Sequence, residues 1–310
     1  MDDVLIIGGS AASTAAAIYL ARRHAKLRVV SYDWGGEVAR SGEIGNYPGF
    51  VATDGIELSE KFLEHIRSYE VEPELEIKIT SLKKEAEGHF VAGGVKNGEK
   101  VRYEAKAVIV STGSHPRELG VPGEKEFRGK GLTYCTVCDG PLYKGKVVAT
   151  IGGGDSANES GIMMNDIASK AYVLTKNPAM KGDPSLISRL RASKNVTIIP
   201  SASTTQILGE KFVTGLEYED VLTKEKKTLE VQGVFVHIGM IPNVDFLPNA
   251  VEKNQFGEVV VDKNTMQSSM PGLFAAGDVT DMPFKQVGIS IGQGTVAALA
   301  AVTYINKLEA

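Results

Sequence analysis

The sequence predicts an α/β fold of two similar three-layer domains, the second inserted into the first. Its 310 residues are enough for two cores of ordinary size. Two apolar stretches, DDVLIIGG (2–9) and KVVATIGGG (146–154), each indicate a strand that runs into a glycine turn and a helix. Two others, at 107–119 and 233–247, indicate buried strands that end in glycine, with a proline soon after. The closing strand of the first unit therefore precedes the opening strand of the second.

The remaining elements continue this alternation of strand and helix. We expect a helix at 10–24 and a strand at 27–33 in the first unit, and a helix from about Asp155 and a strand at 170–176 in the second. The segment 272–308 indicates a strand, a Gly-Asp turn and an apolar helix, which together are too small to bury their own faces. We assign this segment to the first unit. The expected domains are residues 1–113 with 248–310, and residues 117–244 between them.

The composition is that of a soluble globular protein, with 43% hydrophobic and 23% charged residues and a net charge of −4. No cluster of lysines and arginines suggests a nucleic-acid surface. The apolar N-terminus begins with Asp2 and Asp3, where a signal peptide would carry positive charge, and glycine and serine interrupt it too early for a membrane span. We therefore expect a cytoplasmic protein that binds neither nucleic acid nor membrane.

The second glycine turn matches the pattern G-x-G-x-x-G/A through Gly152, Gly154 and Ala157, with Asp155 and Ser156 between them. It follows an expected strand and precedes an expected helix, which is the context that a pyrophosphate site requires. Glycines let the backbone approach the phosphates, and the helix N-terminus supplies amide hydrogens and partial positive charge. The alternative is a tight turn in an ordinary α/β unit.

The residues after the next strand bear on the kind of nucleotide. Thr175 stands where a protein that binds NAD would carry an acid, and Lys176 and Lys181 follow. A missing acid and nearby lysines favour a 2′-phosphate and hence NADPH. It is equally possible that both lysines are solvated surface charges.

The first glycine turn is less regular. Ser10 replaces the second glycine of the pattern and Ser13 the third, after Gly8. Ser13 is small enough for close packing of helix on strand. At Ser10, either the phosphate sits farther out or the serine hydroxyl donates to it. Asp33 is the one acid near the position expected to bind a ribose.

Cys135 and Cys138 are the only cysteines in the chain. A zinc site needs four ligands, and the five histidines are scattered, so we expect no metal. His237, in the apolar run VFVHIG, is expected to be a hydrogen-bonded core residue. A redox pair explains the spacing better, because C-x-x-C opens and closes a disulfide with little movement. Asp139 could carry its protons, and two Rossmann-like nucleotide-binding domains would bring electrons from a nicotinamide through a flavin.

Four segments resemble the low-molecular-weight thioredoxin reductases: VPGEKEFRGKGLTYCTVCDG, NYPGF, GGGDSANES and GLFAAGDV. The likeness is greatest to the reductase module of the alkyl hydroperoxide reductase flavoprotein, in CDGPLYKGKVV and FKQVGISIGQGTVAA, and it covers nearly the whole chain. It implies a homodimer with FAD that reduces a separate thioredoxin- or glutaredoxin-like protein, because the flavoprotein's N-terminal thioredoxin-like domains are not in this sequence. It also implies a nicotinamide domain that rotates about hinges near residues 113–117 and 244–248.

The resemblance also assigns roles to single residues. Cys138 would accept electrons from the flavin, Cys135 would attack the partner's disulfide, and Asp139 would be the acid–base group. The residues implied to hold FAD are Gly8, Ser10, Ala11, Ala12, Gly36, Glu37, Asn46, Thr112, Gly113, Gly277, Asp278 and Gln286. Those for the nicotinamide cofactor are Gly152, Gly154, Asp155, Ser156, Ala157, Lys176 and Lys181.

The chain departs from the family pattern in two places. Glu37 replaces a glutamine that contacts the flavin, which adds negative charge. The motif His-Arg-Arg with a later Arg becomes Thr175-Lys176-Asn177 with Lys181, and some relatives without this motif take electrons from ferredoxin. NADPH, NADH and ferredoxin therefore remain candidate donors. A flavin-binding sensor without catalysis is the remaining alternative.

Overall fold

The computed structural model describes residues 1–308 and 310, and divides the chain into two compact units. Unit 1 consists of Met1–His115 and Ile241–Ala310, and unit 2 of Pro116–Met240. The chain leaves unit 1 near the expected crossing at 113–117, and it returns at Ile241, a few residues before the expected crossing at 244–248. The strands that enclose the insertion, β8 (Ser114–Pro116) and β17 (Met240–Pro242), pair with each other.

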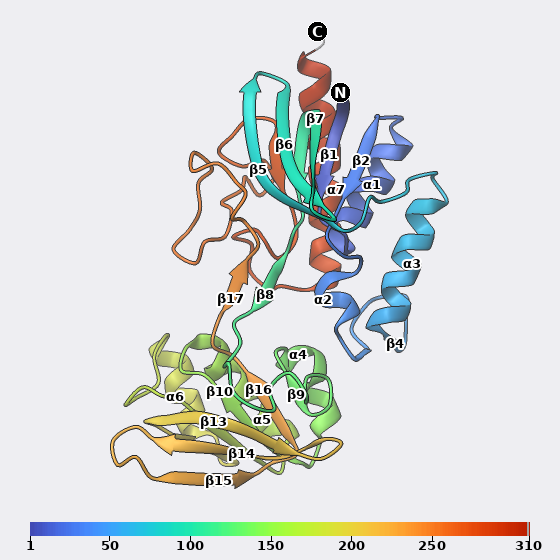
Figure 1. The fold of residues 1–310 in the computed structure, drawn as a ribbon. Coiled ribbons are helices and arrows are strands. Elements are labelled where there is room, and N and C mark those ends of the chain that lie inside the picture. The colour runs from blue at the N-terminus through green and yellow to red at the C-terminus, as the bar shows by residue number, and fades with distance from the viewer. Residues whose placement is uncertain (309) are drawn as a thin grey trace. The chain divides into compact units, whose positions relative to one another are not determined.

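Unit 1 is built on a six-stranded sheet in the order β2-β1-β7-β6-β5, with β18 also paired to β7 (Figure 1). The strands β2, β1, β7 and β18 run parallel, whereas β5, β6 and β7 form an antiparallel meander. The core strands are almost wholly apolar, because both of their faces are covered. The elements of this sheet are β1 (Asp2–Ile7), β2 (Leu27–Val30), β5 (Ile77–Ala86), β6 (His89–Lys96), β7 (Glu99–Val110) and β18 (Leu273–Ala275).

Two helices of small residues pack closely in unit 1. A β-carbon built on Gly294 of α7 would lie 2.1 Å from the carbonyl oxygen of Ala12 in α1, so only glycine permits this approach. By length and composition α7 would qualify as a membrane span, but it buries Ala297, Ala298 and Ala301 in the core of unit 1, as a core helix does. The helices and short strands are α1 (Ala11–Arg22), α2 (Gly36–Ala39), β3 (Glu43–Ile44), β4 (Thr53–Asp54), α3 (Gly55–Arg67) and α7 (Val287–Leu308).

Unit 2 contains a parallel sheet in the order β12-β11-β10-β16-β9, which is the doubly wound order of nucleotide-binding folds. Alternate residues of β10 point to opposite faces. Val148 packs with Met164 of α5, while Ala149 and Ile151 pack toward the antiparallel sheet β13-β14-β15. The unit therefore has three layers. Its strands are β9 (Leu132–Thr133), β10 (Val147–Ile151), β11 (Lys170–Leu174), β12 (Val196–Ile199), β13 (Ala202–Gly209), β14 (Val213–Asp220), β15 (Lys226–Glu230) and β16 (Gly233–Val236), and its helices are α4 (Thr136–Asp139), the 3-10 helix η1 (Gly140–Tyr143), α5 (Asp155–Ile167) and α6 (Pro184–Ala192).

Candidate active site

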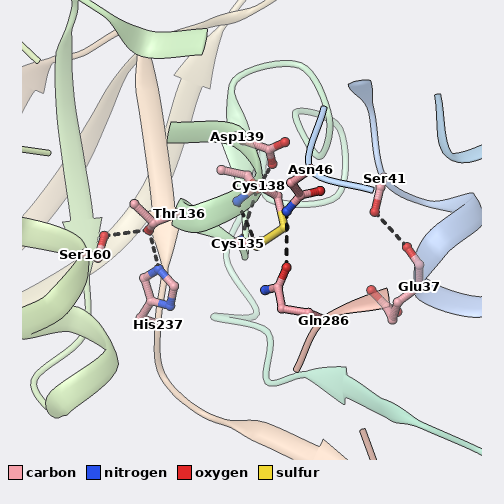
Figure 2. The surroundings of a disulfide bond; sticks show 11 residues. Glu37, Ser41, Asn46, Cys135, Thr136, Cys138, Asp139, Ser160, His237 and Gln286 are labelled. Carbon is pink, nitrogen blue, oxygen red and sulfur yellow. Dashed lines mark hydrogen bonds between the residues drawn. A yellow bond between two sulfur atoms is a disulfide. The ribbon is translucent and has the colours of Figure 1, made fainter. Parts of the chain in front are cut away.

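The structure joins Cys135 and Cys138 in a disulfide at the start of α4 in unit 2 (Figure 2). Cys135 caps the helix, because its Sγ accepts a hydrogen bond of 3.1 Å from the backbone N–H of Cys138. Its carbonyl oxygen accepts another, also of 3.1 Å, from the N–H of Asp139. The single helical turn thus holds both sulfur atoms in place through the backbone.

Asp139 follows the disulfide directly. Burial raises the pKa of its carboxyl group, and a hydrogen bond that the Thr133 hydroxyl donates to it opposes this shift in part. The same hydroxyl oxygen accepts the backbone N–H of Cys135 at 3.2 Å. A carboxyl group that keeps its proton to a higher pH than usual is suited to proton transfer.

A row of polar side chains lies against Thr136, between the two cysteines. The Oγ1 atom of Thr136 is 2.7 Å from Ser160 Oγ and 2.7 Å from His237 Nε2 (Figure 2), and Ser160 Oγ is 2.9 Å from Thr150 Oγ1. Burial lowers the pKa of His237 to about 4, so the imidazole is neutral at neutral pH. His237 is hydrogen-bonded as expected, but its bond to the redox segment had no signal in the sequence.

The second glycine turn joins β10 to α5. A β-carbon built on Gly152 would lie 2.2 Å from the carbonyl oxygen of His237, and one on Gly153 would lie 2.4 Å from Thr175 Oγ1. Gly154 has no such neighbour within 4 Å, so the turn is open at this residue. The helix continues from it through Asp155. This turn has the shape that a pyrophosphate requires.

The segment 177–183, which we call the strap, is bound to this turn and to α5. The N–H of Lys181 donates to the carbonyl of Gly153 at 2.7 Å, and Asn158 Nδ2 donates to the carbonyl of Lys181 at 2.9 Å. The N–H of Asp183 donates to Asp155 Oδ1 at 2.7 Å. The strap therefore fixes the backbone of Lys181 beside Gly153, while the Lys181 side chain is exposed.

Lys176 and Thr175 lie just before the strap. Thr175 is buried, and its hydroxyl oxygen accepts both the backbone N–H and the side-chain amide of Asn177 at 3.2 Å. Lys176 is exposed, and no hydrogen bond to the glycine turn holds its backbone as one holds that of Lys181 within the described residues. The two predicted lysines are thus placed differently.

The first glycine turn is held by serine hydrogen bonds. The hydroxyl of Ser10 donates to the carbonyl of Gly35 at 2.7 Å, so its single proton is already used within the protein. The backbone N–H of Ser10 donates to Ser13 Oγ at 3.1 Å, which is 3.1 Å from Ser111 Oγ. Gly8 must be glycine, because a β-carbon there would lie 2.2 Å from the carbonyl oxygen of Ser111.

Other predicted residues of unit 1 lie beside this turn. A β-carbon on Gly277 would be 3.3 Å from that of Ala12, and one on Gly36 would be 3.8 Å from that of Ser10. Burial raises the pKa of Asp278. The remaining contacts are Gly277 N–H to Gln293 Oε1 (2.6 Å), Ser290 Oγ to Asp278 Oδ1 (3.3 Å), Asn46 Nδ2 to Gln286 Oε1 (3.2 Å, Figure 2), Glu37 to Arg40 (3.0 Å), Asp33 to Arg40 (3.3 Å) and Thr112 Oγ1 to the carbonyl of Asn243 (2.7 Å).

Residues 2–297 match the family described as pyridine nucleotide-disulphide oxidoreductase. The chain belongs to this family. It is 41% identical over 305 residues to the NADH dehydrogenase of Bacillus subtilis, and 42% identical over 305 residues to an alkyl hydroperoxide reductase of Staphylococcus aureus. Each match covers 98% of this chain but 59% of the relative, so the chain spans less than two thirds of these relatives' length.

Solved structures of thioredoxin reductases match this pyridine nucleotide-disulphide oxidoreductase along its whole length. The enzyme of Streptococcus pyogenes is 30% identical with a TM-score of 0.89, and the match covers 99% of each chain. That of T. acidophilum is 36% identical with a TM-score of 0.65, also over 99% of each chain. These matches confirm the resemblance drawn from the motifs and the α/β fold of two Rossmann-like domains. The protein is a flavin-dependent disulfide oxidoreductase, and its family implies FAD and a nicotinamide cofactor.

The residues of unit 1 fit FAD. The first turn of α1 carries no acidic residue, so its amide hydrogens and partial charge can receive a diphosphate. Gly36 and Gly113 have left-handed backbones, and Gly113 has open space where a side chain would stand. The Asp278 carboxylate can accept hydrogen bonds from hydroxyl groups. FAD supplies two-electron transfer between a nicotinamide and a disulfide.

Proposed function

We propose that this chain passes electrons from NAD(P)H, through FAD and the Cys135–Cys138 pair, to the disulfide of a thioredoxin- or glutaredoxin-like protein. The disulfide carries the proposal, because it begins a helical turn whose next carboxyl group, Asp139, has a raised pKa. Similarity to the two thioredoxin reductases supports this kind of partner. The curated relatives bear other names, so the acceptor is the part most in need of a test.

In the proposed reaction the chain's own sulfur atoms exchange bonds. Reduction of the Cys135–Cys138 disulfide consumes two electrons and two protons, and Asp139 gives a proton to the Cys138 sulfur. The Cys135 thiolate then attacks the partner's disulfide and forms a mixed disulfide. The Cys138 thiolate attacks Cys135 and restores the original bond, while the partner leaves with two thiols and the two protons.

For the donor we propose NADPH, with unit 2 as the binding unit. The strap supports this choice, because it fixes Lys181 beside Gly153, near the place where an NAD-binding protein would carry its ribose acid. The open turn at Gly154 would receive the pyrophosphate. The proposed nicotinamide-cofactor residues are Gly152, Gly154, Asp155, Ser156, Ala157, Lys176 and Lys181.

Unit 1 is the proposed FAD-binding unit. Its glycine turn and the Gly277-Asp278 turn meet at Ala12, which supports their joint role. Because the Ser10 proton is used by Gly35, we propose that FAD phosphates are bound by backbone amides and not by this hydroxyl. A homodimer and a cytoplasmic location remain predictions. The proposed FAD residues are Gly8, Ser10, Ala11, Ala12, Gly36, Glu37, Asn46, Thr112, Gly113, Gly277, Asp278 and Gln286.

A second candidate keeps the disulfide chemistry and replaces the donor by ferredoxin. A structure named Ferredoxin-Flavin Thioredoxin Reductase, from Clostridium acetobutylicum, is 30% identical over 99% of this chain, with a TM-score of 0.53. In that case the second glycine turn would be a structural remnant.

The deciding experiment is an anaerobic titration of the flavin absorbance. NADPH, NADH and reduced ferredoxin are added separately, and a thioredoxin disulfide is then supplied to the reduced protein. Bleaching at stoichiometric NADPH with reoxidation by thioredoxin would support the proposal. Bleaching by ferredoxin alone would favour the second candidate. Purified protein without flavin, or reduced protein that thioredoxin does not reoxidise, would overturn the assignment of cofactor or acceptor.

A further inference from the structure

Four side chains in unit 2 form one continuous hydrogen-bonded row, from Thr150 through Ser160 and Thr136 to His237. They come from β10, α5, α4 and the end of β16, so the row connects the parallel sheet to the redox segment (Figure 2). Its successive distances are 2.9, 2.7 and 2.7 Å. Thr136, the third member, is the residue that directly follows Cys135.

The direction of these hydrogen bonds follows from counting protons, since each hydroxyl group has one. Thr150 is fully buried, and within the described part of the chain Ser160 is the partner of its hydroxyl group. If Thr150 donates to Ser160, then Ser160 donates to Thr136 and Thr136 donates to His237 Nε2. The opposite direction would leave the Thr150 proton buried without an acceptor, which is costly.

His237 is therefore an acceptor at Nε2, and its ring proton lies on Nδ1. A charged imidazole could not accept this bond, and the low pKa of His237 agrees with a neutral ring. The backbone of His237 is fixed as well, because its N–H donates to the carbonyl of Ile151 at 2.7 Å. The ring is thus a fixed acceptor at the edge of the parallel sheet.

We propose that His237 is a positioning residue that holds Thr136 in place and so stabilises the Cys135–Cys138 disulfide relative to the dithiol. A fixed Thr136 keeps the two thiols near each other after reduction, which raises their effective concentration for closing the bond. Without this acceptor the reduced segment has more conformations, and the equilibrium shifts toward the dithiol. The inference rests on the proposed redox role of the pair.

The test is a redox titration of the purified holoprotein in dithiothreitol buffers, with the thiols trapped and counted by mass. His237→Leu removes the acceptor and should shift the equilibrium toward the dithiol by about five- to tenfold. His237→Gln places an amide oxygen near the position of Nε2 and should stay within about twofold of the wild type. Thr136→Val should shift the equilibrium as His237→Leu does, and the double variant should shift it no further.

Ser160→Ala is the matched control, because it breaks the row while leaving the bond from Thr136 to His237. Its equilibrium should stay within about threefold of the wild type even if its stability falls. If His237→Leu does not fold, nitrogen-15 spectra of wild-type histidine decide, with the proton expected on Nδ1 of His237.

Equal shifts in the Leu and Gln variants, no shift in either, or a proton on Nε2 would overturn the inference. A wild-type pair that dithiothreitol cannot reduce would overturn the proposed function itself, and the inference with it. A wild-type pair that titrates while the variants behave like it would overturn the inference alone.

Discussion

The backbone N–H of Lys181 donates a hydrogen bond to the carbonyl oxygen of Gly153, with 2.7 Å between the two atoms. This bond and that from Asn158 hold Lys181 at both of its backbone polar groups. Its side chain must therefore emerge beside the glycine turn. Lys176 is exposed without comparable anchoring, and this difference separates two lysines that are equivalent in the sequence.

We expect Lys181→Ala to raise the KM for NADPH by about 10- to 50-fold, because hydrogen bonds to charged groups contribute roughly 1.5–3 kcal/mol. Its KM for NADH should change by less than about threefold. Lys176→Ala is the matched control and should leave both values within about threefold. Steady-state kinetics with both nucleotides provide the test, and equal losses for NADPH and NADH would contradict a role in binding the 2′-phosphate.

The two glycine turns should respond differently to alanine. Gly8→Ala should cost about 3 kcal/mol or more, because Gly8 has a φ of +135° and its β-carbon would meet Ser111. Gly154 has a φ of −105° and open space around it, so Gly154→Ala should cost only about 1 kcal/mol. It should nevertheless raise the nucleotide KM, because the methyl group occupies the open turn. Urea unfolding and kinetics measure the two effects, and a stable Gly8→Ala variant would contradict this account.

Cys138→Ser should abolish turnover with a thioredoxin disulfide, by at least about a thousandfold, while FAD stays bound. The serine oxygen cannot form the bond that passes electrons onward. Flavin content by absorbance and activity with thioredoxin are measured on the same sample. Full activity of this variant would disprove the role of the pair, whereas loss of FAD would point to damage in folding.

Asp139→Asn should stabilise the fold at neutral pH. The raised pKa means that the folded protein binds the Asp139 proton more tightly than the unfolded chain, so stability falls as pH rises above the ordinary value of 3.8. The gain in the variant should therefore be present at pH 7 and vanish toward pH 3. Turnover should drop by about a hundredfold through loss of the proton donor. Thermal unfolding at several pH values tests the sign, and a variant that is less stable at pH 7 would refute it.

His237 should make stability depend on pH in the opposite sense. The unfolded chain gains a proton on this residue below about pH 6.5, whereas the folded protein gains it only near pH 4. The wild type should thus lose stability as pH falls from 6.5 to 4, and His237→Gln should lose less over the same range. Parallel unfolding curves for the two proteins would contradict a neutral, buried imidazole.

The principal strands and helices could be predicted because they begin at glycine turns with a clear apolar pattern. The meander β5-β6-β7 was not anticipated, although Asn97-Gly98, both with positive φ, is a strong hairpin signal between two of its strands. The site was predictable where a motif is continuous, as in Cys135–Asp139. The row that reaches His237 was not, because its four members come from four elements and meet only through the fold.

The way in which the chain enters and leaves unit 2 also has a consequence for synthesis on the ribosome. Unit 2 is one uninterrupted segment, so all of it is made before β18 and α7 emerge. The small residues of α1 find their partner Gly294 only at the end of translation, and until then the N-terminal half of unit 1 exposes an apolar sheet and helix. The inserted unit can complete its fold while the unit that surrounds it is still waiting for its last strand and helix.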